Sequence, residues 1–303
     1  MYRTKGLCCL FLGSLRGGIS LRHHTTRLSM SSSSGYIDAH AHLIHEQFKG
    51  EEDSIAVKCK EHGVDFVIVN GLEPISNRAV LELCQRHTNL VAAAGIYPID
   101  AACNVINEEL WKHPFPPPDK FDVDKEIDFI DELARTKQII AVGECGLDKH
   151  YLTDAVSMNE QERVLRKLMQ VAKKHDLPII LHTRKQEERT LELLLEEGVV
   201  RADIHCFCGK PKLGLKYAEA GYYLSIPSAV EKTSSPFRRL VEALPMDKVL
   251  TETDCPYMGP DKGQRNDPTT VIRGVAAIAE VKGISPDEAR LIIRANFEKL
   301  FRI

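Results

Sequence analysis

The sequence has no long apolar run and no excess of charge of either sign. No stretch reaches about 18 consecutive apolar residues, so no membrane-spanning helix is expected. The 40 basic residues are balanced by 43 acidic ones, and the net charge of −3 excludes the strongly basic surface of a non-specific nucleic-acid coat. This balance still allows a nucleic-acid enzyme with a local positive groove.

Two further classes of protein lack their signatures here. The nine cysteines are odd in number and irregularly spaced, which excludes a disulfide framework and indicates reduced thiols in an intracellular protein. No GxGxxG or GxxxxGK[ST] motif follows the first predicted strand, which argues against an open, doubly wound nucleotide-binding sheet. The 303 residues, of which 43% are hydrophobic and 27% charged, suit one α/β barrel instead.

The N-terminal segment, residues 1–35, contains no acidic residue, five basic residues and a run of serines at 31–34. This composition is typical of an organelle transit peptide, so we predict a disordered leader that could direct the protein to mitochondria. Met30 offers a second start, which would give a cytoplasmic or nuclear form. A secretory signal is the weaker interpretation because the apolar stretch Leu7–Leu12 is short and Arg16 follows closely.

Residues 36–303 alternate between short apolar runs and longer stretches with helical periodicity. Runs such as Phe66–Val69 are continuously apolar, as expected for strands covered on both faces of a parallel sheet. Eight β-then-α units predict a single-domain (β/α)8 barrel, the TIM barrel. The predicted strands are Tyr36–His40, Val64–Asn70, Leu90–Ile96, Gln138–Glu144, Leu177–His182, Ala202–Phe207, Gly221–Ile226 and Lys248–Thr253.

One segment interrupts this alternation, at about residues 101–123. It contains Trp111 and the proline-rich run Pro114–Pro118, and it is too long for a routine connection. We therefore predict an inserted loop that forms either a lid or a surface insertion.

Polar side chains follow the apolar runs at several predicted strand ends. His40 and His42 stand two residues apart, so the period of a strand sends both imidazoles to the same face. A barrel gathers its strand ends on one face, and unpaired polar groups inside it would be costly, so a metal site is the better interpretation than a polar core. The candidate ligands are His40, His42, Glu144, His182, His205 and Asp254.

The type and number of these ligands indicate the kind of metal centre. Imidazole and carboxylate without thiolate suit Zn²⁺, Mn²⁺ or Mg²⁺, and six ligands exceed what one catalytic ion needs. We therefore predict two divalent ions that share a carboxylate and lower the pKa of a bound water for hydrolysis. Four cysteines lie close to the ligands in sequence, but no CxxC pair occurs, so we expect thiols rather than ligands: Cys145, Cys206, Cys208 and Cys255.

The motifs that carry these residues resemble those of the TatD family of metal-dependent deoxyribonucleases, in the amidohydrolase-like barrel superfamily. The resemblance covers roughly residues 36–303 and rests on five motifs in the family's order. They are Asp38-Ala-His-Ala-His42, Gly143-Glu-Cys-Gly-Leu-Asp148, Leu181-His-Thr-Arg184, His205-Cys-Phe-Cys-Gly209 and Thr251-Glu-Thr-Asp-Cys-Pro256.

The resemblance implies a division of the ligands between two ions. One ion would be held by His40, His42 and Asp254, a second by His182 and His205, with Glu144 between them.

The sequence also departs from the family pattern. The family usually has a histidine in a Gly-Ile-His-Pro segment, whereas Gly95-Ile-Tyr-Pro98 places Tyr97 there. The insertion at 101–123 follows directly, so the rim of the barrel is altered twice and substrate contacts are expected to differ.

We predict that Glu144, Asp254 and Arg184 are catalytic, and that Arg184 and Arg265 contact the substrate. Arg184 can grip a phosphate through its planar guanidinium, or simply pair with Glu187 or Glu188. Asp254 can accept a proton from the attacking water as well as bind metal. Arg265, in a segment that resembles the family's late Arg-Asn-x-Pro element, is a candidate phosphate contact.

Asp148 and a group of lysines have two interpretations each. Asp148 can orient a metal ligand or Lys149, or it can cap the turn that follows it. Lys210, Lys212 and Lys216 can line the path of a nucleic-acid strand, although a solvated helix face is the more common role of such a run.

The favoured function is a metal-dependent deoxyribonuclease that cleaves DNA phosphodiester bonds, exonuclease-like, with a water activated by the two ions. One alternative keeps the site and changes the bond to an amide, a lactone or an aminoacyl ester. A second alternative is a non-catalytic scaffold barrel. DNA is the expected partner, and no membrane or obligate protein partner is predicted.

Overall fold

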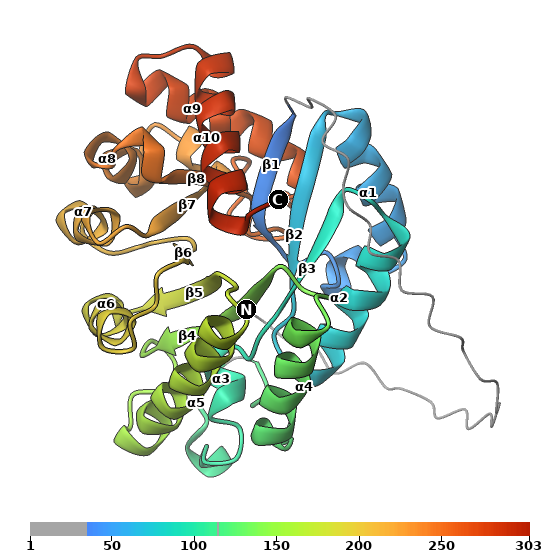
Figure 1. Ribbon diagram of the computed structural model, residues 1–303, viewed down its shortest axis with the longest axis vertical. Helices are drawn as coiled ribbons and strands as arrows, with labels where there is room; N and C mark the ends of the chain where they lie inside the picture. The colour runs from blue at the N-terminus through green and yellow to red at the C-terminus, as the bar shows by residue number, and fades with distance from the viewer. Residues whose placement is uncertain (1–34, 114) are drawn as a thin grey trace.

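The computed structural model describes residues 35–113 and 115–303 (Figure 1). The predictions for the leader lie outside the described residues except at Gly35, whose amide donates to Asp65 Oδ2 at 2.9 Å. Among the helices of the described residues, none combines the length and the apolar character needed to cross a bilayer.

Eight parallel strands follow one another around the sheet in chain order, which confirms the predicted (β/α)8 barrel. The first and last strands meet where Asp254 N–H donates to His40 O at 2.9 Å and Thr251 Oγ1 donates to Ile37 O at 2.9 Å. The strands are β1 (Tyr36–Ala41), β2 (Val64–Asn70), β3 (Leu90–Ala94), β4 (Ala141–Asp148), β5 (Ile179–Arg184), β6 (Ala202–Ile204), β7 (Tyr223–Pro227) and β8 (Val249–Glu252).

The helices surround the strands on the outside (Figure 1). Because all the strands are parallel, the loops that leave their carboxyl ends lie on one face of the barrel. Capping side chains mark many helix starts; Asp154, for example, accepts from Ser157 N at 2.9 Å. The helices are α1 (Glu52–Glu61), α2 (Pro74–Arg86), α3 (Pro98–Ala101), α4 (Val123–Arg135), α5 (Ala155–Lys174), α6 (Glu187–Glu196), α7 (Pro211–Glu219), α8 (Pro236–Ala243), α9 (Val271–Lys282) and α10 (Pro286–Phe301).

Only β2 has its predicted bounds at both ends, and the largest differences are in β4 and β6. β4 begins at Ala141 rather than Gln138, because Gln138 N–H donates to Leu133 O and closes the end of α4. It continues four residues past Glu144, since Cys145–Asp148 pair with β5. β6 ends at Ile204, so His205 lies one residue beyond its strand rather than within it.

The core fills the barrel and the layer between sheet and helices. On α5, Leu165, Leu168 and Met169 are buried against the sheet, as their spacing predicts. Each such side chain contributes about 1.5–3 kcal/mol relative to an exposed one. The helices thereby fix the strand ends that carry the polar residues.

The described residues of the segment 101–123, all except Pro114, are packed onto the surface of the barrel. It contains a short 3₁₀ turn, η2 (Glu108–Leu110), and Trp111 Nε1–H donates to Phe115 O at 2.6 Å. His113 Nε2 lies 2.9 Å from Tyr151 O, and the rings of His113 and Phe115 contact the Tyr151 ring edge-on. The insertion is therefore fastened to the loop after β4, beside the strand ends.

Candidate metal centre

The structure brings all six predicted ligands together at the carboxyl ends of the strands. β1 supplies His40 directly and His42 one residue beyond its end, while Glu144 lies within β4 and His182 within β5. His205 and Asp254 follow β6 and β8. All six are buried or nearly so; the most exposed are His182 at 15% and Asp254 at 14%.

Glu144 is the centre of this cluster. Its Oε1 lies 3.1 Å from both His182 Nδ1 and His205 Nε2. Its Oε2 lies 3.2 Å from both His40 Nε2 and His42 Nε2. One carboxylate thus presents each of its two oxygens to a separate pair of imidazoles.

Asp254 completes the group on the β1 side. Its Oδ1 lies 3.5 Å from His42 Nε2 and 3.9 Å from His40 Nε2. The backbone of Asp254 has a φ of +51°, a left-handed conformation that turns the chain sharply after β8 and directs the carboxylate toward the two histidines.

Two glycines let β4 carry Glu144 so close to β5. Gly143 has a φ of +154°, and a Cβ there would stand 2.7 Å from Ile180 O. Gly146 has a φ of +147°, and a Cβ there would overlap His182 O. Only glycine fits either position, so the Gly-Glu-Cys-Gly sequence is required by the close approach of the two strands.

The charges within the cluster favour metal-binding protonation states for His40 and Glu144. Although burial acts in the opposite sense, the neighbouring carboxylates raise the pKa of the other three imidazoles, which must lose a proton to bind a metal. Burial and the neighbouring His205 lower the pKa of His40 to about 3, which leaves an imidazole lone pair for a metal. Although burial acts in the opposite sense, His205 and His182 hold the pKa of Glu144 well below its ordinary value. Burial likewise opposes the shift at His42, but Asp254 and Glu144 raise its pKa to about 9, so a proton and a metal compete for this nitrogen.

These residues fit divalent metal ions. The Nε2 atoms of His40 and His42 lie only 3.1 Å apart, so the two imidazoles are positioned to share a cation once His42 has lost its proton. Glu144 Oε2 is buried and accepts no hydrogen bond from any described residue, a costly state that a cation would relieve. Nitrogen and oxygen donors without thiolate match Zn²⁺ and Mn²⁺ chemistry.

Three groups of ligand atoms are close enough to hold an ion in the described chain. His40, His42 and Asp254 form one, and Glu144, His182 and His205 form another, which matches the division that the family resemblance implies. The third combines His40 and His205 with Glu252, a residue that the sequence analysis did not identify.

Glu252 belongs to a buried carboxyl network behind His205. Its Oε2 lies 3.7 Å from His205 Nδ1 and 2.6 Å from Ser225 Oγ, which in turn lies 3.0 Å from Asp203 Oδ2. One hydroxyl proton cannot serve two carboxylates, so one of the two acids must be protonated. Burial raises the pKa of Asp203 well above its usual range and that of Glu252 to about 7, which agrees with this requirement.

Asp148 contacts one of the predicted ligands and also caps the turn that follows it. Its Oδ2 lies 3.1 Å from His182 Nε2, and its Oδ1 accepts the backbone N–H of His150 at 2.6 Å. The first contact orients the His182 ring through Nε2 and turns Nδ1 toward Glu144, a common arrangement behind metal-binding histidines. Tyr97 OH donates to the same Oδ2 over 3.5 Å, so the residue that departs from the family pattern joins this network.

A cavity of about 340 Å³ opens above the cluster. Arg184 lies in its wall with the guanidinium 5.2 Å from the centre of the Tyr151 ring, and it forms no ion pair with Glu187 or Glu188 in the described chain. The lining residues are Tyr97, Glu144, Tyr151, His182, Thr183, Arg184, His205, Cys206, Cys208, Asp254, Tyr257 and Met258.

Arg265 is not among the residues that line this cavity. It forms a two-bonded ion pair with Glu51, with Nη1 and Nη2 at 2.9 and 2.7 Å from the carboxylate oxygens, and it covers the ring of Phe48. Its contact with substrate stays a prediction.

The cysteines near the cluster divide into two kinds. Cys145 and Cys255 are buried thiols, whereas Cys206 and Cys208 line the cavity. No cysteine belongs to any candidate ligand group found among the described residues. The cluster is therefore built from imidazoles and carboxylates, as the sequence predicts.

A (β/α)8 barrel with such a cluster at the carboxyl ends of its strands defines a metal-dependent hydrolase of the amidohydrolase-like kind. Within this class the chain belongs to the TatD family, since the family described as TatD related DNase matches residues 37–302.

Individual relatives agree with this assignment. The chain is 30% identical to the uncharacterized metal-dependent hydrolase YabD of Bacillus subtilis, over 88% of this chain and 98% of the relative. It is 29% identical to the deoxyribonuclease TATDN3 of Homo sapiens, over 88% and 94%. The crystal structure of YJJV, a TatD homologue from Escherichia coli, superposes with a TM-score of 0.75 at 27% identity, covering 88% and 98%.

Proposed function

We propose that the protein is a deoxyribonuclease that hydrolyses DNA phosphodiester bonds with two divalent ions. The observation that carries the proposal is the position of Glu144, whose two oxygens each face a separate pair of imidazoles. His40, His42 and Asp254 would hold one ion, His182 and His205 the other, and Glu144 would bridge them.

When bound, such ions lower the pKa of a coordinated water and offset the negative charge that develops on the scissile phosphate. Asp254 supplies the base. Burial acts to raise the pKa of its carboxyl, but His42 and His205 hold that pKa below its ordinary value. Asp254 is therefore ionised and can accept a proton from the attacking water. Asp148 orients the His182 ring through Nε2.

Arg184 is the proposed phosphate contact. Burial acts to lower the pKa of its guanidinium, but Tyr151 and Asp148 raise that pKa above its ordinary value. Arg184 therefore stays positively charged in the cavity wall. A cation at this place suits a phosphodiester, which is anionic before and during the reaction, better than a neutral amide or lactone. The deoxyribonuclease name of the human relative supports the same substrate.

Metal removal and reloading test this function. The protein is dialysed against a chelator, reloaded separately with Mg²⁺, Mn²⁺ or Zn²⁺, and offered end-labelled single- and double-stranded DNA, RNA, and a panel of amide, lactone and aminoacyl ester substrates. We expect ladder-like shortening of DNA that requires reloading. Hydrolysis confined to the amide and ester panel would assign the site to the other bond types, and no hydrolysis with any ion would favour a scaffold.

We also propose that residues 36–303 form the catalytic domain and that residues 1–35 act as a transit peptide. Fusion of residues 1–35 to a fluorescent reporter tests this, with mitochondrial fluorescence as the expected result. Diffuse fluorescence in the cytosol would contradict it.

A further inference from the structure

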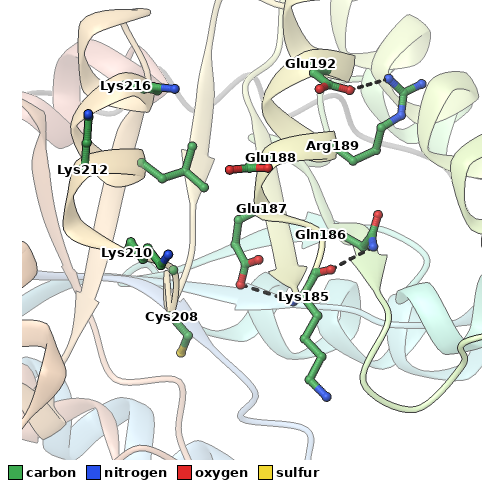
Figure 2. Close-up of a pocket in the computed structure, with 12 residues that line it drawn as sticks. Lys185, Gln186, Glu187, Glu188, Arg189, Glu192, Cys208, Lys210, Lys212 and Lys216 are labelled. Carbon is green, nitrogen blue, oxygen red and sulfur yellow. Dashed lines mark hydrogen bonds and ion pairs between the residues drawn. The ribbon is translucent and has the colours of Figure 1, made fainter.

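A second hollow, of about 710 Å³, lies between α6 and α7 next to the metal centre (Figure 2). We call it the α6–α7 groove; it is lined by Lys185, Gln186, Glu187, Glu188, Arg189, Glu192, Cys208, Gly209, Lys210, Lys212, Leu213 and Lys216. The groove and the cavity above the metal cluster share Cys208. Lys185 of the groove directly follows Arg184 of the cavity, so the two hollows adjoin.

The charge of the groove contrasts with that of the chain. Five basic and three acidic side chains line it, so it is positive, whereas the whole chain carries −3. Figure 2 shows Lys212 and Lys216 along one helix and Glu188 and Glu192 along the other, with Cys208 and Lys185 toward one end. Lys212 and Lys216 stand one helical turn apart and are both exposed.

The unpaired charges of the groove are four lysines and, among its acids, Glu188, which forms no ion pair with any described residue. Arg189 Nη1 pairs with Glu192 at 2.9 Å, and Glu187 Oε1 accepts the backbone N–H of Lys185 at 3.2 Å. By contrast, the Nζ atoms of Lys185, Lys210, Lys212 and Lys216 form no ion pair with any described residue. Their charge is available to an anion from outside.

The walls of the groove are fixed in position. Tyr217 on α7 is buried, and its hydroxyl donates to the backbone oxygen of Glu187 at the start of α6 over 2.6 Å. This bond ties the two helices together at the end of the groove that adjoins the cavity. A ligand would therefore meet lysines on a preformed surface.

We propose that the α6–α7 groove binds the sugar-phosphate backbone of the DNA strand on one side of the bond being cleaved. This inference rests on the proposed deoxyribonuclease function and adds a path for the strand. A row of unpaired lysines beside the active cavity suits the regularly repeated phosphates of a nucleic acid. The lining contains no aromatic side chain on which bases could stack, so the groove holds the backbone without reading sequence.

A paired lysine substitution tests the groove. The test variant is Lys212→Ala with Lys216→Ala on α7, and the matched control is Lys60→Ala with Lys299→Ala, two exposed helical lysines outside the groove lining. Binding of a fluorescent single-stranded 15-mer is measured by anisotropy in chelator over a range of salt concentrations. The slope of log K against log salt is negative, and we expect its magnitude to fall by about 1.4 when two phosphate contacts are removed.

The expected loss of affinity at low salt is at least about tenfold for the test variant and none for the control. An unchanged slope, or an equal loss in the control, would overturn the groove proposal. Because this readout needs no catalysis, it stands even if the wild-type protein cleaves no DNA, a result that would refute the proposed function alone.

A kinetic comparison follows if DNA is cleaved. The ratio of kcat/KM for a 15-mer to kcat/KM for a dinucleotide reports the contribution of the distant strand. We expect this ratio to fall about tenfold in the test variant and to keep its value in the control. An unchanged ratio in the test variant would show that the strand does not follow the groove.

Discussion

The floor and the rim of the active cavity are built in different ways. The floor comprises His40, His42, Glu144, His182, His205 and Asp254, which come from or directly follow strands and are fixed by the buried sheet. The rim comprises Tyr97 and Tyr151, which lie outside the strands and pack against the insertion at 101–123, and Arg184, the last residue of β5, whose guanidinium faces the Tyr151 ring. The strands of the barrel therefore position the metal-binding residues, while the residues around the mouth of the cavity determine which substrate can reach them.

The largest expected effect comes from the centre of the floor. Glu144→Gln keeps the shape of the side chain but removes the negative charge between the two imidazole pairs. We expect kcat on DNA to fall by about 1,000-fold or more, because metal binding and charge stabilisation fail together. Activity within tenfold of the wild type would contradict the bridging role. Glu280→Gln, at an exposed glutamate on α9, is the control.

A smaller effect is expected one layer behind the floor. Asp148→Asn removes the carboxylate that orients His182 through Nε2. Metal affinity, measured by calorimetric titration of the chelated protein, should fall about 10–100-fold. An affinity equal to that of the wild type would show that His182 is held without Asp148.

The floor was predictable from the sequence because its residues follow apolar runs that the barrel brings to one face. Glu252 and Asp203 escaped prediction: each lies within an apolar strand, and only the neighbouring Ser225 shows that they share a buried network. The Thr-Glu-Thr-Asp sequence did contain a signal, since Glu252 stands two residues before Asp254, at the spacing that identified His40 and His42.

The rim was less predictable because long-range contacts decide it. For Arg265, which was expected near the mouth, the sequence did not indicate that the loop after β1 brings Glu51 to its guanidinium as an ion-pair partner. The sequence identified the insertion by its prolines and length, yet nothing in it showed that His113 and Phe115 would pack on Tyr151.

At the rim, Arg184 should affect substrate more than metal. Arg184→Ala is expected to lower kcat/KM on DNA by about 10–100-fold while metal affinity is kept, since the lost contact is a charged hydrogen bond to phosphate. Arg184→Lys should recover only part of this loss, because an ammonium cannot make the bidentate contact. Full recovery of kcat/KM in Arg184→Lys would show that a positive charge at this position is sufficient and that no bidentate contact is needed.

The smallest effect is expected at Tyr97. Its hydroxyl reaches Asp148 over a long 3.5 Å, so Tyr97→Phe should lower kcat/KM by only about two- to fivefold, the value of one weak hydrogen bond. Steady-state kinetics of this variant beside Asp148→Asn gives the comparison. A loss as large as that of Asp148→Asn would place Tyr97 in the floor rather than in the rim.

The central claim is that Glu144 bridges two ions, and anomalous diffraction from crystals soaked in Mn²⁺ tests it most directly. The account predicts two anomalous peaks about 3.5–4 Å apart, one beside His40 and His42 and one beside His182 and His205, with Glu144 between them. A single peak, or two peaks that do not share Glu144, would contradict it.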